Sequence, residues 1–167
     1  MPNDTFKKKL GKILSVVPFL CMMILIFRFS AQDGPTSGSL SYKVCSFLVS
    51  IADHLFSLNL SENAFASTAE GLQFFVRKGA HMTEYFILAL SIFLPLTVWF
   101  GRKLSPVKRL WVTFPVAVLC ASLDEYHQTF VPGRSGSPKD VLVDSIGITL
   151  ACLAVLLYFH FHKKPAD

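Results

Sequence analysis

The sequence predicts an all-α, polytopic membrane protein with about four transmembrane helices and an additional amphipathic segment outside the membrane. Charged residues make up only 16% of the 167-residue chain, against about 25% in an ordinary soluble domain. The apolar residues are also gathered into four runs that approach the ~30 Å needed to cross a bilayer. These observations exclude a disordered chain and indicate a single membrane domain over residues 1–167.

We expect the four spans at residues 13–29, 81–100, 110–127 and 141–161. Each uncharged run alone is somewhat short, so each helix must include polar residues to complete the crossing. The second span, for example, reaches the required length only if it includes His81 and Glu84. The first run also resembles a secretory signal, but the bulky residue Phe29 makes a poor cleavage site, so we interpret this run as a retained span.

Lysine and arginine are concentrated on one side of the predicted membrane. Ten of the sixteen lie before the first span, in the short loop 101–109, or after the last span at Lys163 and Lys164. The positive-inside rule places these segments, and therefore both termini, in the cytoplasm. The same segments explain the net charge of +5, and nothing in the chain indicates binding to nucleic acid.

The long connection between the first two spans has two parts. Residues 30–39 are rich in Ser, Gly, Pro and Thr, and we expect them to form a loop. Apolar residues then recur at helical spacing in region 40–76, which predicts an amphipathic extracytoplasmic segment that lies on the membrane surface or packs over the bundle. Within it, Ser61 or Asn63 is a candidate helix N-cap.

The fourth span carries two local signals in its sequence. Ser137 followed by Pro138 is typical of a helix start, with a capping side chain and a proline in the first turn. Farther along, Gly147 and Ala151 continue the face that carries Asp140 and Asp144. Small residues of this kind predict a close helix contact.

Polar residues gather at three helix ends that the predicted topology brings to the outer membrane surface. Charged groups at membrane depth are costly, so such a cluster requires mutual pairing, water or a ligand. Helical spacing places Arg77, His81 and Glu84 on one face of the second span. The residues are Arg77, His81 and Glu84, with Lys78 beside them; Asp124, Glu125, His127 and Gln128 at the end of the third span; and Arg134 and Asp140 before and within the fourth.

One interpretation of this cluster is an anion site. Arg77, Lys78 and Arg134 offer donors that suit a phosphate or pyrophosphate group, such as that of a lipid head group. The lipid bilayer and an anionic lipid or cell-wall precursor are therefore the expected partners.

Other interpretations remain open at this stage. The pairs His81/Glu84 and Asp124/His127 have the i, i+3 spacing that brings an imidazole and a carboxylate to one metal ion. The same pairs fit a metal-free site for acid–base catalysis. Finally, the ion pairs could only clamp the helices together, as a structural scaffold. The sequence alone assigns no metal and no cofactor.

Four stretches of the chain resemble the VanZ-like family of bacterial membrane proteins: residues 27–32, 77–88, 124–137 and 140–147. The most specific is the D-E-x-H-Q…F-x-P-G-R-S-G…D run, and the K-x-x-H-x-x-E-Y run adds a second match. The resemblance covers residues 13–160. One departure is Asp144, which stands where members of the family commonly have Asn.

The resemblance implies an integral membrane protein of the bacterial cell envelope, in a family named for a protein that lowers susceptibility to the antibiotic teicoplanin. Residue by residue, it selects the cluster named above and adds Tyr85 to the ligand-binding set. The candidate catalytic residues are His81, Glu84, Asp124, Glu125 and His127, and the candidate ligand-binding residues are Arg77, Lys78, Tyr85, Gln128, Arg134 and Asp140.

The leading hypothesis is that the cluster recognises an envelope component or an anionic lipid-linked precursor, and thereby affects access of glycopeptide antibiotics. The alternatives are a membrane-embedded enzyme that acts on a phosphorylated lipid through acid–base or metal-assisted chemistry, and the structural scaffold.

Overall fold

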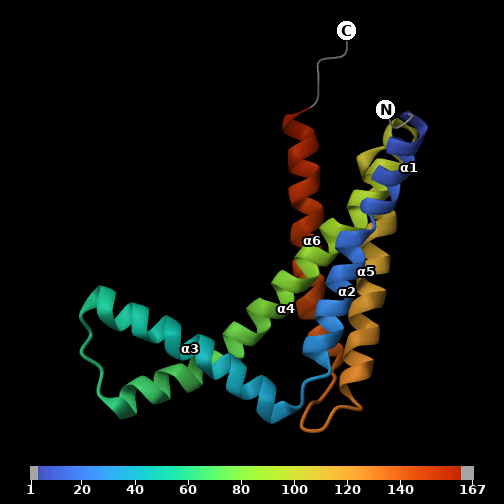
Figure 1. The fold of residues 1–167 in the computed structure, drawn as a ribbon. Coiled ribbons are helices and arrows are strands. Elements are labelled where there is room, and N and C mark those ends of the chain that lie inside the picture. The colour runs from blue at the N-terminus through green and yellow to red at the C-terminus, as the bar shows by residue number, and fades with distance from the viewer. Residues whose placement is uncertain (1–3, 163–167) are drawn as a thin grey trace.

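A computed structural model describes residues 4–162. The elements are α1 (Asp4–Leu14), α2 (Val17–Ser30), α3 (Gly34–Phe56), α4 (Glu62–Phe100), the short 3-10 helix η1 (Gly101–Lys103), α5 (Pro106–Gln128) and α6 (Pro138–Phe161) (Figure 1). The described part of the chain contains helices and no strand, which confirms the all-α class. Lys163 and Lys164, expected to follow the last span, lie outside the described residues.

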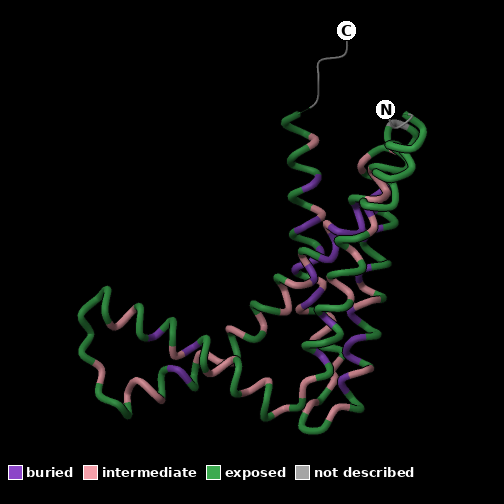
Figure 2. Tube along the Cα trace, in the orientation of Figure 1, coloured by how far each residue is buried: buried purple, intermediate pink, exposed green. Residues whose placement is uncertain are grey.

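Four helical segments are long and apolar enough to cross a membrane. They are residues 4–30, which combine α1 and α2, and the helices α4, α5 and α6. Large apolar side chains remain exposed along these helices, and much of the trace is exposed (Figure 2). Such a surface suits lipid tails, because large exposed apolar patches are typical of proteins that contact a membrane. The number of spans expected from the sequence is confirmed.

Polar side chains fix the beginnings of the helices. Ser61 accepts a hydrogen bond from the Ala64 N–H at the start of α4, and Ser137 accepts one from the Lys139 N–H at the start of α6. Such caps satisfy N–H groups that have no partner inside the helix. Pro138 follows in the first turn of α6, so the predicted starts at Ser61 and at Ser137 are both confirmed.

The loop expected over residues 30–39 is wrong beyond residue 33, because α3 begins at Gly34. Asp33 caps this helix, since its Oδ1 accepts the Thr36 N–H at 2.8 Å. Hydrogen bonding with the Thr36 side chain, and secondly with the Thr36 N–H, lowers the pKa of the exposed carboxyl group. Pro35 lies in the first turn, where its missing N–H costs nothing. The turn-forming residues that suggested a loop are therefore helix-start residues.

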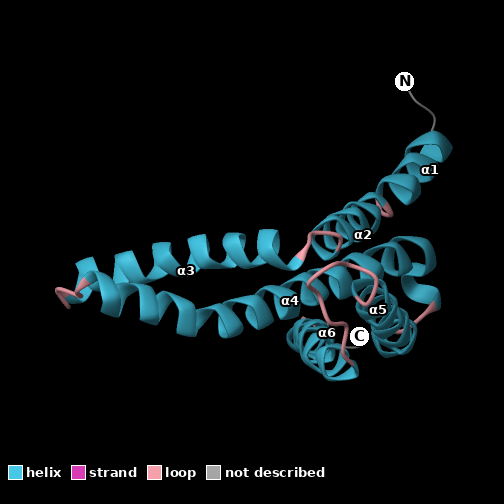
Figure 3. Cartoon of the chain, turned by 90° about the horizontal axis from the view of Figure 1, so that it is seen from below, coloured by secondary structure: helices cyan, strands magenta, loops and turns pink. Residues whose placement is uncertain are grey.

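The region 40–76 forms a helical arm that projects from the bundle (Figures 1 and 3). It consists of most of α3 and the first part of α4, which lie side by side. Cys45, Val49 and Ala69 are buried between the two helices. The helix that contains the second span therefore begins at Glu62, well before residue 81, and runs without interruption from the arm into the bundle.

The bundle has its core where α4 meets α5 and α6. The most buried residues there include Tyr85, Leu88, Ala117, Ala121 and Ile148, each 0% exposed. The alanines allow the helix backbones to approach closely, as is common between helices in membranes.

The closest approach joins α6 to α4 at Gly147. A Cβ atom at this position would collide with the backbone carbonyl of Met82. Ala151, one turn farther along α6, is 1% exposed. The predicted contact through small residues on the fourth span is thus confirmed, and it lies next to the polar end of the bundle.

Replacing Gly147 by Ala should destabilise the protein, because overpacking of this kind costs about 1–3 kcal/mol. We expect a lower midpoint of thermal unfolding in detergent. Gly71→Ala is the matched control, since a Cβ on Gly71 of α4 would meet open space and a helical Gly→Ala change stabilises by about 0.5–1 kcal/mol. Equal effects of the two substitutions would contradict the close contact.

Candidate functional site at one end of the bundle

The polar residues selected from the sequence lie at one end of the bundle. This is the end where the loop between α5 and α6 turns, opposite to the N-terminus and the end of α6 (Figure 1). The last turn of α2, residues 77–84 of α4, the last turn of α5 and the first turns of α6 contribute to it. The structure therefore brings the tips of separate helices together, as the site hypothesis requires.

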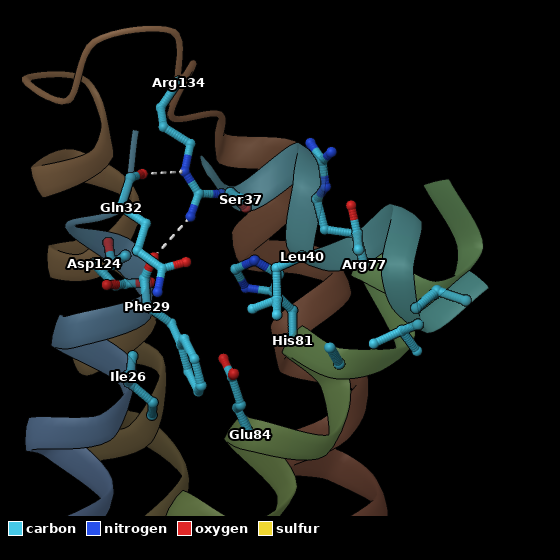
Figure 4. A pocket seen from close by; sticks show the side chains of 15 residues that line it. Ile26, Phe29, Gln32, Ser37, Leu40, Arg77, His81, Glu84, Asp124 and Arg134 are labelled. Atoms are coloured by element: carbon cyan, nitrogen blue, oxygen red, sulfur yellow. Dashed lines mark hydrogen bonds between the residues drawn. The ribbon is translucent and has the colours of Figure 1, made fainter. Parts of the chain in front are cut away.

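A pocket of about 250 Å³ lies where the arm joins the bundle (Figure 4); we call it the arm pocket. One part of its wall is apolar and includes Ile26, Phe29, Leu40, Val44 and Val76. The polar part includes Ser37 and Gln32 together with five groups from the predicted cluster, which are Arg77, His81, Glu84, Asp124 and Arg134. The pocket is thus amphiphilic, with an apolar side against a charged side.

A second pocket of about 340 Å³, the loop pocket, lies beneath the α5–α6 loop. Its wall is more polar and includes Lys78, Gln128 and Asp140. Arg77, His81 and Arg134 line both pockets. His81 therefore stands between two spaces that a ligand or water can occupy.

Arg134 fastens the α5–α6 loop to the end of α2. Its Nη2 donates to the Phe29 carbonyl at 2.8 Å and its Nε to the Gln32 carbonyl at 3.1 Å (Figure 4). Terminal helix carbonyls lack partners and carry partial negative charge, so a guanidinium stabilises them. Burial lowers the pKa of Arg134 from its ordinary value, but an arginine stays protonated in proteins.

The loop is also attached to the start of α3. The Gly34 N–H donates to the Pro132 carbonyl at 3.0 Å. Gly34 and Gly133 approach so closely that a Cβ on Gly34 would collide with the Gly133 backbone, and Gly133 has a φ of +71°, which favours glycine. The run Pro132-Gly133-Arg134 is therefore needed to form this turn and to attach the α5–α6 loop to the start of α3.

Two contacts restrain the start of α6. Lys78 of α4 forms an ion pair with Asp140, and Glu125 of α5 accepts the Ser137 N–H at 2.9 Å through Oε2. Charge-assisted hydrogen bonds of this kind are stronger than neutral ones. Lys78, Glu125 and Asp140 thus connect three helices at the polar end.

Helical spacing would place Asp124, His127 and Gln128 on one face at the end of α5, but the structure gives them two different environments. Gln128 donates to Asp124 Oδ2 at 3.2 Å, and both residues are buried. His127 lies against α2, where its Nδ1 is 3.4 Å from the Ser30 hydroxyl and its ring is 4.4 Å from that of Phe27, between centroids. His127 lines neither pocket.

Within residues 4–162, the group of side chains that could hold a metal ion consists of His81, Glu125 and Asp144. It comes from three helices and differs from the i, i+3 pairs expected from the sequence. His81 Nδ1 lies 3.7 Å from Asp144 Oδ1, which is too long for a hydrogen bond.

Tyr85 is placed in the core rather than in either pocket. It is 0% exposed, and its hydroxyl has no hydrogen-bond partner among the described residues.

Sequence reasoning missed Gln32 and Ser30 as parts of the site and left Asp144 outside it. The spacing of Asp140 and Asp144, one turn apart, was the available signal for Asp144, since Asp140 was already selected.

A model of the VanZ/LLP1 family matches residues 15–160 of the chain. This range includes every helix that lines the two pockets. No curated protein and no solved structure matches the chain.

Arg134→Ala should release the α5–α6 loop, because the Phe29 and Gln32 carbonyls lose their donor and hydrogen bonds to charged groups contribute about 1.5–3 kcal/mol. We expect faster amide hydrogen exchange in residues 129–137 and in the last turn of α2. The control is Lys139→Ala, which removes an exposed cation from the same end of the bundle. If Arg134→Ala exchanges like the wild type, Arg134 does not hold the loop.

Proposed function

The chain belongs to the VanZ/LLP1 family, and we propose that it is a multi-pass membrane protein that binds the phosphate-bearing head group of an envelope lipid or lipid-linked precursor. The observation that carries this proposal is the amphiphilic arm pocket, whose wall combines two arginines with a set of apolar side chains. A protein that sequesters or shields such a precursor would alter the access of glycopeptide antibiotics.

The lining of the arm pocket fits an amphiphile better than a free anion. Ile26, Leu40 and Val44 offer a surface for the first part of a lipid chain, whose burial is favourable by roughly 25 cal/mol per Å². Arg77 supplies planar donors for phosphate oxygens, and Arg134 adds a second positive charge to the wall. A ligand with one apolar and one anionic part would use both sides of the pocket.

Arg77 is the cation that is free to bind a ligand. Lys78 is occupied by Asp140, and Arg134 by backbone carbonyls. Arg77 is exposed and forms no ion pair or side-chain hydrogen bond within residues 4–162, although it lines both pockets. A phosphate group would therefore gain a partner at Arg77 without breaking an existing contact.

We place the site on the non-cytoplasmic face of a bacterial cell membrane. Support comes from two independent features. The Lys and Arg distribution favours cytoplasmic termini, and the polar end of the bundle is opposite to the N-terminus and the end of α6 (Figure 1).

The second candidate function is a membrane-embedded enzyme that acts on a phosphorylated lipid. Glu84 and Asp124 favour it, because two carboxylates and the His81 imidazole line the same pocket as the arginines. Convergent titratable groups in a pocket are typical of acid–base catalysis.

The binding proposal is tested with farnesyl phosphate, an isoprenoid monophosphate, against farnesol, which lacks the phosphate. We expect the purified full-length protein in detergent to bind farnesyl phosphate more tightly, measured by calorimetry. Arg77→Gln should weaken that binding by roughly tenfold or more, because a lost charge-assisted hydrogen bond exceeds the 1.4 kcal/mol that corresponds to tenfold.

Lys139→Gln is the control, since it removes a cation near the site but outside both pockets. Equal affinity for the two probes, or no effect of Arg77→Gln, would contradict phosphate recognition. Release of inorganic phosphate from the probe, lost in Glu84→Gln, would instead favour the enzyme.

The proposed orientation is tested by cysteine labelling in a background without the four native cysteines. Ser135→Cys, in the α5–α6 loop, should react with a membrane-impermeant maleimide in intact cells. Lys103→Cys, in the loop between α4 and α5, should react only after permeabilisation. Both positions are exposed in the structure, so the reverse pattern would place the site on the cytoplasmic face.

A further inference from the structure

We infer that His81, Glu125 and Asp144 form a binding site for a divalent transition-metal ion, with Zn²⁺ as the best match. One imidazole nitrogen and two carboxylates are a mixed donor set that suits Zn²⁺ and, second, Mn²⁺, rather than Ca²⁺ or Mg²⁺, which prefer oxygen ligands alone. The inference does not depend on the proposed lipid binding.

The geometry of the three side chains fits a common ion. One ligand atom from each lies within 4.8 Å of the others. Zn²⁺ binds nitrogen and oxygen ligands at about 2.0–2.2 Å, so two ligands of one ion stand roughly 3–4 Å apart. The 3.7 Å between His81 Nδ1 and Asp144 Oδ1 matches this separation, whereas a direct hydrogen bond would bring the two atoms closer.

The ligand atoms of Asp144 and His81 are buried and lack partners. Asp144 is 1% exposed, and neither of its carboxylate oxygens has a hydrogen-bond partner among the described residues. His81 Nδ1 is buried and equally unpaired. Buried polar atoms without partners are rare because each costs free energy. An ion bound between these side chains would satisfy the three atoms together.

The local charge also favours a cation. Glu125 is 4% exposed and Asp144 1% exposed, and within residues 4–162 no Lys or Arg nitrogen lies within 4.0 Å of either carboxylate. The nearest cations on the packed elements are otherwise occupied, Lys78 by Asp140 and Arg134 by carbonyl groups. A divalent ion would balance two carboxylates that are costly to bury unpaired.

Surrounding contacts hold the ligands in place and leave the site accessible. The Ser137 N–H fixes the Glu125 carboxylate, and the close approach at Gly147 brings Asp144 of α6 to His81 of α4. Outer contacts of this kind orient metal ligands. His81 lines both pockets, so an ion and its remaining ligands have a route in. Three protein ligands with solvent access are typical of metal sites that bind a further group.

The test is metal uptake by the full chain in detergent, without a polyhistidine tag. The protein is stripped with a chelator, dialysed against Zn²⁺ or Mn²⁺, and analysed by mass spectrometry of the elements. We expect about one Zn²⁺ per chain and a higher midpoint of thermal unfolding with the ion, since ligand binding to the native state stabilises it. If the wild-type protein takes up neither Zn²⁺ nor Mn²⁺, the inference is overturned and no variant is needed.

Substitutions then locate the ion. Asp144→Asn and His81→Gln should each weaken Zn²⁺ binding by at least about tenfold and abolish the thermal shift. Asp33→Asn and His127→Gln are matched controls, because these residues lie at the same end of the bundle but outside the group, and both should keep the ion. Uptake that survives Asp144→Asn, or that is lost equally in the controls, overturns the assignment. Lipid binding is measured separately, so its failure would leave this result unchanged.

Discussion

The polar end of this protein depends on the close approach of α4 and α6 at Gly147. Because Gly147 has no side chain, the backbone of α6 lies directly against the Met82 carbonyl of α4. One turn before Gly147 along α6 is Asp144, which faces His81, and one turn earlier Asp140 meets Lys78. A larger residue at 147 would separate these pairs, so the geometry of the site follows from a missing methyl group.

The three cations near the site have three different roles, although they look alike in the sequence. Lys78 is paired with Asp140, and Arg134 is bound to the carbonyl groups that end α2. Arg77 remains exposed at the boundary of both pockets. As a result, the carboxylates of Glu125 and Asp144 have no Lys or Arg side chain as an ion-pair partner in the described part of the structure.

The number of spans and the helix start at Ser137 were predictable because they depend on neighbouring residues, such as Ser137 and Pro138 or the apolar runs themselves. The grouping of His81, Glu125 and Asp144 was not, since helix rotation and depth are set by packing between helices that the periodicity of one helix does not reveal. Arg109 shows the same limit. The sequence counts it only as a cytoplasmic charge, yet it is 5% exposed and donates to Thr97 Oγ1 at 2.8 Å.

The uninterrupted course of α4 has a mechanical consequence. Its 39 residues extend for roughly 60 Å at about 1.5 Å per residue, and they belong to the arm at one end and to the core at the other. A hydrogen-bonded helix transmits tilt along its axis much more readily than a loop does. Arg77 and His81 lie where the arm joins the bundle, so a change in the tilt of the arm would move these two side chains relative to α5 and α6 and alter the shape of both pockets.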